Sequence, residues 1–198
     1  LPCLFGLHLY TVHRVNDDGT VPKDNPFVKT PGAVGSIWTV GHRNPQGFAF
    51  DPVTNKLWET EHGPTGGDEL NLIRGGANYG WPLVSFGHHY VGKYIDAAEA
   101  SALQSPIFHW TPSIGVSNVL VYEGAAFPKW RGQLFVGSLG ARIGRTLYRF
   151  DVRPEKEYTA GHLAGCRHYA GAQPAPEIDT AAPGRARGIR EHPCELGR

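Results

Sequence analysis

The chain has 198 residues and a formal net charge of +1, which argues against bulk electrostatic attraction to nucleic acid or to an anionic membrane surface. We therefore expect no nucleic-acid partner, and an anionic ligand has to be met by local charges. Glycine (26 residues) and proline (16 residues) are abundant, and no amphipathic helical stretch stands out. This composition predicts an all-β, loop-rich protein.

The first ten residues, LPCLFGLHLY, are apolar but too short to cross a bilayer, so we expect no membrane span. They also lack the basic region and the small-residue cleavage site of a signal peptide. The chain contains no methionine and begins with Leu1, which indicates a fragment of a longer protein. For the cysteines, Cys3, Cys166 and Cys194, two interpretations stay open: a Cys166–Cys194 disulfide or, as we favour, free or buried thiols.

The first half of the chain reads as short strands separated by turns. Residues 7–16 alternate in apolar character and lead into a turn, and residues 36–41 form another short apolar run. GFAFDPVTNKLWETE (47–61) is the clearest hairpin, because DPVTN is a turn cluster between two strand-like runs. A third strand is expected at GDELNLI (67–73), and residues 83–113 read as a long insertion between strands.

Three further apolar runs, at 118–124, 133–139 and 145–152, predict a meander of antiparallel strands. The units that begin near residues 47 and 118 resemble each other, as the blades of a β-propeller do. Residues 153–198 are rich in Ala, Gly, Pro and Arg and show little strand pattern. We therefore divide the chain into a β-domain at 1–152 and an irregular or disordered tail at 153–198.

Two short motifs offer groups that suit an anionic ligand and a cation. Arg43 and Asn44 lie in HRNPQG, where the guanidinium offers a fork of donors for a carboxylate, although an ordinary surface ion pair is the simpler interpretation. Gly63 and Pro64 lie in EHGPTGGDE, where successive carbonyls suit a hard cation such as Ca²⁺, although a plain turn also explains them. Asp68 and Glu69 are either calcium ligands or solvated charges, and we favour solvated charges.

Histidines and tryptophans complete the candidates. Each histidine is a conceivable acid–base group, but a structural or surface role is the simpler interpretation for His42, His62, His88, His89 and His109. The tryptophans are interpreted as packing residues of the sheets rather than as a stacking box for a ligand: Trp81, Trp110 and Trp130.

The order of several motifs points to one family. GHRNPQGFAFDP, ETEHGPTGGDELNLI, GGANYGWP, TPSIGVSN, FPKWRGQLFVGSL and LYRF follow one another between Val15 and Val152. This series resembles the soluble glucose/sorbosone dehydrogenases, the quinoprotein aldose sugar dehydrogenases. The resemblance does not extend to residues 153–198.

The resemblance implies a six-bladed β-propeller, of which this chain holds roughly half, with pyrroloquinoline quinone (PQQ) and Ca²⁺ near its axis. Such enzymes oxidise the anomeric carbon of an aldose to a lactone, with hydride passing to the quinone and electrons leaving to an external acceptor. It also implies that Arg43 and Asn44 contact the quinone end of PQQ. By the same resemblance, Gly63 and Pro64 are expected to hold the cofactor calcium through their carbonyls, and His62 is expected to border the cofactor.

The chain also departs from the family pattern. The family's general-base histidine lies upstream of the matching region, so the catalytic base is unknown. Gly140 follows Ser138-Leu139, where the family has a PQQ-binding lysine, and Arg142 is our candidate to replace that charge, with Arg145 as the alternative.

The resemblance further implies a periplasmic or secreted location for the full-length protein and a homodimer for the intact one. Two other functions remain open: a non-enzymatic propeller module that binds a protein or glycan, and a metal-dependent lactonase.

Overall fold

The computed structural model describes residues 10–88, 102–140, 145–152, 167–170 and 190–193. These ranges are all-β except for one turn of 3-10 helix, η1 (Pro128–Trp130), so the predicted fold class is confirmed. Within the same ranges, no helix is long and apolar enough to cross a membrane.

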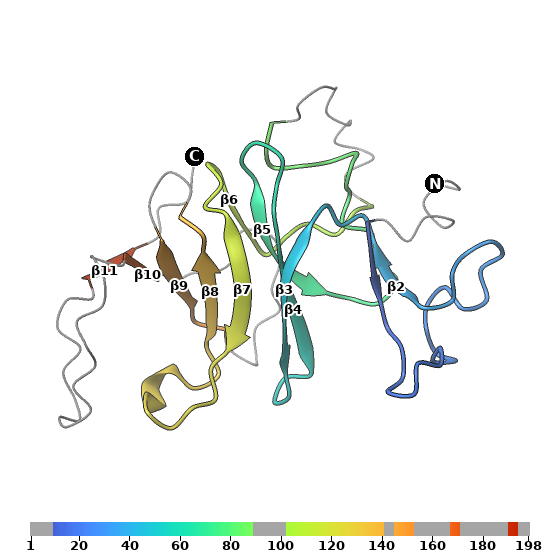
Figure 1. Ribbon diagram of the computed structural model, residues 1–198, viewed down its shortest axis with the longest axis horizontal. Helices are drawn as coiled ribbons and strands as arrows, with labels where there is room; N and C mark the ends of the chain where they lie inside the picture. The colour runs from blue at the N-terminus through green and yellow to red at the C-terminus, as the bar shows by residue number, and fades with distance from the viewer. Residues whose placement is uncertain (1–9, 89–101, 141–144, 153–166, 171–189, 194–198) are drawn as a thin grey trace.

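The first of two large sheets is antiparallel with the strand order β3-β4-β5-β6 (Figure 1). Its strands are β3 (Pro45–Asp51), β4 (Lys56–Glu61), β5 (Asp68–Ile73) and β6 (Phe108–Trp110). The predicted hairpin is confirmed as β3 and β4. Its turn forms because the Asp51 carboxylate accepts the backbone N–H groups of Val53 (3.0 Å) and Thr54 (3.3 Å), and Asn55 adopts a positive φ of 55°.

The second large sheet has the order β11-β10-β9-β8-β7 and is also antiparallel. The predicted meander is confirmed as β7 (Val116–Val121), β8 (Leu134–Ser138) and β9 (Thr146–Phe150). Within the tail that the composition predicts to be irregular, the structure describes two four-residue strands, β10 (Arg167–Ala170) and β11 (Arg190–Pro193). They extend this sheet from the edge strand β9, because β10 pairs with β9 along its whole length.

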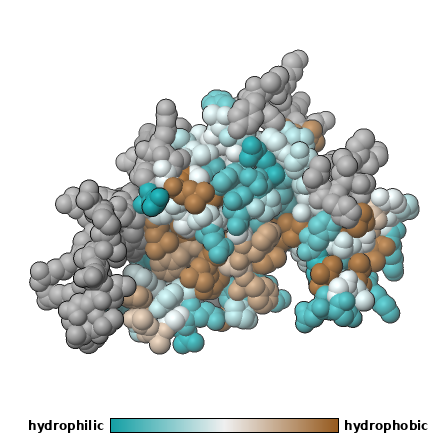
Figure 2. All heavy atoms as spheres, in the orientation of Figure 1, coloured by the Kyte–Doolittle hydropathy of each residue, from teal (hydrophilic) through white to brown (hydrophobic). Residues whose placement is uncertain are grey.

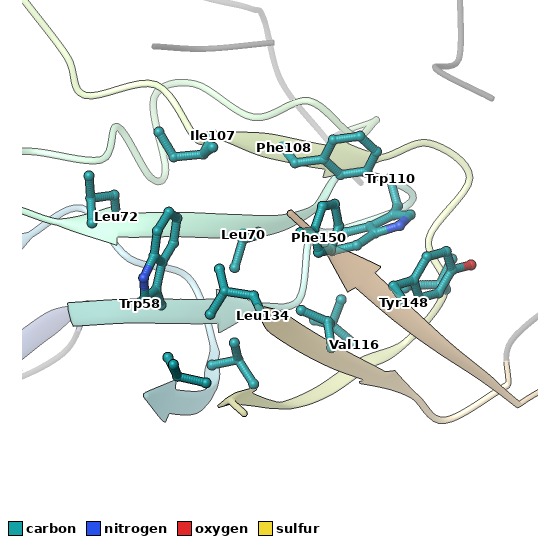
Figure 3. Close-up of a cluster of buried hydrophobic side chains, with 14 residues drawn as sticks. Trp58, Leu70, Leu72, Ile107, Phe108, Trp110, Val116, Leu134, Tyr148 and Phe150 are labelled. Carbon is teal, nitrogen blue, oxygen red and sulfur yellow. The ribbon is translucent and has the colours of Figure 1, made fainter. Parts of the chain in front are cut away.

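The main hydrophobic core lies between these two sheets (Figure 3). Trp58 and Leu70 of the first sheet and Leu134 and Phe150 of the second are at most 1% exposed. Trp110 packs edge-to-face against Phe150, so this tryptophan is a packing residue, as predicted. Each fully buried aliphatic or phenyl side chain contributes about 1.5–3 kcal/mol, so this interface is what holds the sheets face to face.

The sheets come closest where β3 and β7 lie side by side (Figure 1). This close approach requires glycine at position 47 of β3, because a Cβ there would lie 2.7 Å from the Cα of Asn118. Thr60 adds a cross-sheet hydrogen bond by donating its hydroxyl to the carbonyl of Ser117 (2.8 Å).

The outer surfaces of the two sheets carry exposed apolar side chains. Phe48 and Phe50 of β3, Leu120 of β7 and Leu147 of β9 are between 41% and 56% exposed. Figure 2 shows hydrophobic residues across the middle of this face, with hydrophilic residues above them and along the lower edge.

The part of the first sheet's outer face that lies over β4 is covered by a smaller unit. β1 (Thr11–His13) and β2 (Ile37–Val40) form an antiparallel pair, in agreement with the two apolar runs that the sequence shows there. The segment 77–81 runs alongside the end of β2, because Val40 donates its N–H to the carbonyl of Ala77 (3.1 Å). The candidate site lies where these covering segments meet β4 and β5.

Candidate functional site

The segment 41–44 is fixed against residues 78–81. Gly41 has a φ of +81°, and a Cβ at this position would lie 2.2 Å from the side-chain oxygen of Asn78. The carbonyl of Gly41 accepts the N–H of Trp81 (2.9 Å). Only glycine meets both demands, and the result is that Arg43 is brought next to Trp81.

A small depression, open to solvent, lies beside these segments. It brings together Arg43, His62 and Gly63, three of the residues that the sequence singled out. Asn44 and Pro64 follow directly in the chain but do not line this pocket. The complete lining is Gly41, Arg43, Glu61, His62, Gly63, Gly67, Glu69, Tyr79, Trp81, Val84 and Ser85.

Arg43 is held by two contacts and keeps donor capacity for a ligand. Its Nη1 donates to the carbonyl of His62 (3.1 Å), and its guanidinium carbon lies 5.3 Å from the centroid of the Trp81 ring. Its buried Nε has no hydrogen-bond partner among the described residues. Trp81 therefore supports the arginine in the pocket, which differs from the packing role predicted for it.

Glu61 is a residue of the pocket lining that the sequence analysis missed. Its Oε2 accepts the backbone N–H groups of Arg43 (2.5 Å) and Asn44 (3.1 Å), and its Oε1 accepts the amide of Asn71 (3.1 Å). A buried carboxylate with several donors is held firmly, so Glu61 fixes the backbone of the Arg43–Asn44 pair. No local pattern in KLWETE reveals this, because the donors lie 17 and 18 residues earlier in the chain.

The neighbours of Glu61 form a buried acidic group. The amide of Asn71 also donates to Glu59 (3.0 Å) and to Glu69 (3.3 Å). Burial is the main reason that the pKa values of Glu59 and Glu69 lie well above their usual range, and the nearby charge of Glu61 raises both pKa values further. Burial likewise raises the pKa of the Tyr79 hydroxyl, which donates to the carbonyl of Leu72 (2.6 Å).

The side chains of His62 and Asn44 are already engaged within the protein. His62 Nε2 lies 2.6 Å from the carbonyl of Val116, so this nitrogen carries the hydrogen and donates it across to β7. The Asn44 side-chain oxygen accepts the Gln46 amide (3.0 Å), while its backbone carbonyl accepts the N–H of His62 (3.1 Å). The two predicted motifs are thus joined directly.

The interpretation of Asp68 as a solvated charge is wrong. Its side chain is 1% exposed and accepts four hydrogen bonds. The donors are the N–H of Gly63 (3.1 Å), the hydroxyl of Ser113 (2.8 Å) and the N–H groups of Ile114 (3.1 Å) and Val116 (3.0 Å). Asp68 therefore ties the Gly63–Pro64 loop to the start of β7. Glu69 lines the pocket and accepts the amide of Asn71 (3.3 Å).

Several predicted residues fall outside the described ranges. Arg142, the candidate for a PQQ-binding charge, is one of them, as are His89 and the three cysteines. Its alternative Arg145 is described and lies exposed on the surface.

The described histidines differ in environment, and His109 allows a prediction about pH. Its ring stacks on Phe86 at 4.3 Å, and burial lowers its pKa below the ordinary value of 6.5. The folded state therefore binds this proton less readily than the unfolded chain, so stability falls as pH drops below about 6.5. We expect a His109→Gln variant to lose less stability between neutral and mildly acidic pH, measured by urea unfolding at each pH. Parallel curves for variant and wild type would contradict this.

Comparison with known proteins gives a consistent result. The family model for glucose/sorbosone dehydrogenase matches residues 6–167. The aldose sugar dehydrogenase YliI of Escherichia coli (strain K12) is 46% identical over 129 residues, which are 64% of this chain and 35% of that protein. Quinoprotein glucose dehydrogenase B of Acinetobacter calcoaceticus is 41% identical over 156 residues, which are 77% of this chain and 30% of that protein.

Solved structures agree with this assignment. A structure described as a glucose dehydrogenase superposes with a TM-score of 0.72 at 34% sequence identity, covering 84% of this chain and 46% of that chain. The predicted partial propeller is thereby confirmed. The chain spans about a third of the length of the curated relatives it matches.

Proposed function

Because the chain belongs to the glucose/sorbosone dehydrogenase family, we propose that it is part of a quinoprotein oxidoreductase that oxidises aldoses at the anomeric carbon to lactones. The observation that carries the proposal is the pocket in which Arg43 lies over Trp81, beside His62 and Gly63. PQQ and Ca²⁺ are the proposed cofactors, an aldose is the substrate, and an external acceptor takes the electrons.

The residues present fit the proposed cofactors. PQQ is a flat tricarboxylate, and the unpartnered Nε of Arg43 is a buried donor that suits a carboxylate or quinone oxygen. The Trp81 ring adds an aromatic surface in the same pocket. For Ca²⁺, the carbonyls of Gly63 and Pro64 are the hard oxygen ligands that this ion prefers. The carboxylates of Glu61 and Glu69 add negative charge to the pocket lining.

In this proposal the protein orients and polarises, and PQQ with its calcium supplies a two-electron acceptor for the substrate hydride. Arg43 and Asn44 hold one end of the cofactor, His62 borders it, and Arg142 supplies a further positive charge. Glu61 keeps Arg43 and Asn44 in place through their backbone N–H groups. The catalytic base remains unassigned in this chain. Periplasmic or extracellular location and assembly into a homodimer are further parts of the proposal, and both rest on the family resemblance.

Binding of PQQ provides the direct test. We expect the chain to bind PQQ in a Ca²⁺-dependent manner and an Arg43→Ala variant to bind it about 10- to 100-fold more weakly, since a hydrogen bond to a charged group contributes about 1.5–3 kcal/mol. The measurement is a fluorescence or calorimetric titration. Arg14→Ala is the matched control, because Arg14 does not line the pocket and contacts Asp24 (3.1 Å), Asn25 (3.4 Å) and the Trp38 ring instead. Equal PQQ affinity of the two variants would contradict the assignment of Arg43.

A measurement of dehydrogenase activity distinguishes the proposed enzyme from a non-enzymatic propeller module. With PQQ and Ca²⁺ added, a protein that contains this chain and the catalytic base is expected to reduce a redox dye when an aldose is supplied. Glycan or protein binding that is independent of PQQ, without any dye reduction, would instead support a non-enzymatic propeller module.

A further inference from the structure

A second cluster of polar groups lies behind the pocket, on the sheet face that β2 and residues 77–81 cover. It consists of His42, which follows β2 and Gly41, together with Glu59 and Glu61 of β4. His42 and Glu59 are 0% exposed and Glu61 is 3% exposed. These three residues do not include the Gly63 and Pro64 carbonyls, which are the calcium ligands proposed above, although Glu61 also lines the pocket.

The distances in the cluster suit a single metal ion. His42 Nδ1 lies 3.5 Å from Glu61 Oε1 and 4.0 Å from Glu59 Oε2, and the ligand atoms of the three residues all lie within 4.8 Å of one another. Two atoms that each lie about 2.1 Å from one ion are about 3.0 Å apart at right angles and about 4.2 Å apart on opposite sides. Small side-chain adjustments therefore bring all three groups onto one ion.

The histidine is already oriented as a ligand. Its Nε2 lies 2.8 Å from the hydroxyl oxygen of Thr39, a fully buried residue of β2. When Nε2 donates its hydrogen to this oxygen, Nδ1 presents a lone pair toward the two carboxylates. Histidines that bind metals in proteins usually have their second nitrogen engaged in this way. The ring is also held in position by stacking on Tyr79, at a centroid distance of 4.4 Å.

Two buried atoms of the cluster lack partners. Among the described residues, His42 Nδ1 and Glu59 Oε1 form no hydrogen bond. Both present lone pairs when the histidine is neutral and the glutamate ionised, so they cannot satisfy each other. The Arg43 guanidinium does not neutralise the cluster, because it is directed to the carbonyl of His62 and the Trp81 ring. Buried acceptors without donors are rare, and a cation among them satisfies both.

We propose that His42, Glu59 and Glu61 bind one divalent transition-metal ion, such as Mn²⁺ or Zn²⁺. An imidazole nitrogen favours these ions over Ca²⁺ and Mg²⁺, and two carboxylates balance the charge of the ion. Asn71 orients both carboxylates by donating to Glu59 (3.0 Å) and to Glu61 (3.1 Å). Because Glu61 also accepts the N–H groups of Arg43 and Asn44, the ion would anchor the loop that forms one wall of the pocket.

Metal binding by the whole chain tests the proposal. The chain is treated with a chelator, dialysed against Mn²⁺ or Zn²⁺ with Ca²⁺ in excess, and its metal content is measured by mass spectrometry. We expect one ion per chain. Glu59→Gln keeps the shape of the side chain but removes a charged ligand, and it is expected to weaken binding by about 100-fold. Glu123→Gln, at an exposed position, is the matched control and should bind as the wild type does.

A second measurement covers the case in which a variant folds poorly. In the wild-type chain, Mn²⁺ is expected to broaden the NMR signals of the His42 ring selectively, and this requires no substitution. Retention of full metal affinity by Glu59→Gln would overturn the proposal. The proposal would also be overturned if the wild-type chain takes up no ion and the Glu59→Gln variant is more stable than the wild type at neutral pH. The cluster would then hold protons instead of a metal.

Discussion

Replacing Asp68 by alanine is expected to destabilise the chain by about 3–5 kcal/mol, one of the largest effects of any single substitution in this protein. The carboxylate accepts the N–H groups of Gly63, Ile114 and Val116 and the hydroxyl of Ser113. Without it, three backbone donors in a largely buried region lose their partners, and each unsatisfied buried donor costs about 1–3 kcal/mol. Because the change also frees the Gly63 loop from β7, we expect the pocket to lose its shape.

Urea unfolding followed by tryptophan fluorescence measures this effect. Asp17→Ala is the matched control, because Asp17 is exposed and its loss should change the free energy of unfolding by less than about 0.5 kcal/mol. Asp68→Asn should fall between the two, since the amide keeps one acceptor oxygen but places a donor where the carboxylate had a second acceptor. Equal unfolding free energies for Asp68→Ala and Asp17→Ala would show that the four hydrogen bonds do not stabilise the fold.

The contrast between β4 and Asp68 shows what the sequence could predict. The hairpin of β3 and β4 follows from local signals, the alternation of GFAF and KLWETE and the DPVTN turn, and these signals need no knowledge of distant residues. The position of Asp68 at the start of β5 was likewise predicted. Its burial was not, because three of its four donors are contributed by residues 113–116, which lie 45 or more residues away in the chain.

The candidate site likewise contains residues that the sequence could predict and residues that it could not. Motifs identified Arg43, His62 and Gly63, and the structure places them in one pocket. Glu59 and Glu61 occupy alternate positions of a strand, where a polar residue usually faces water. They are buried because β2 and residues 77–81 cover this second face of the sheet, a tertiary arrangement that the period of a strand does not encode. Charged residues buried in this manner are where local rules are expected to fail and function to be found.

Replacing Gly63 by alanine is expected to abolish the cofactor site while leaving most of the fold intact. A Cβ at this position would lie 2.1 Å from the carbonyl oxygen of Gly66 and 2.3 Å from that of Gly67, whereas real Cβ atoms essentially never come closer than 3.0 Å. Both oxygens belong to the backbone, so the loop itself has to move. We expect a loss of about 1–3 kcal/mol in stability, typical of overpacking, and at least about a 10-fold loss of Ca²⁺-dependent PQQ affinity.

Gly35→Ala is the matched control for this prediction. A Cβ at Gly35 would meet its nearest atom, the Cγ1 of Val21, at an ordinary contact distance of 3.5 Å, so this variant should keep both stability and PQQ affinity. Comparing the two variants separates the general cost of adding a methyl group from the displacement of the carbonyls in the loop. If Gly63→Ala is destabilised but binds PQQ as tightly as Gly35→Ala, the clash is real and the loop does not hold the cofactor. In that case the calcium has to be sought among the carboxylates that face the same pocket, Glu61 and Glu69.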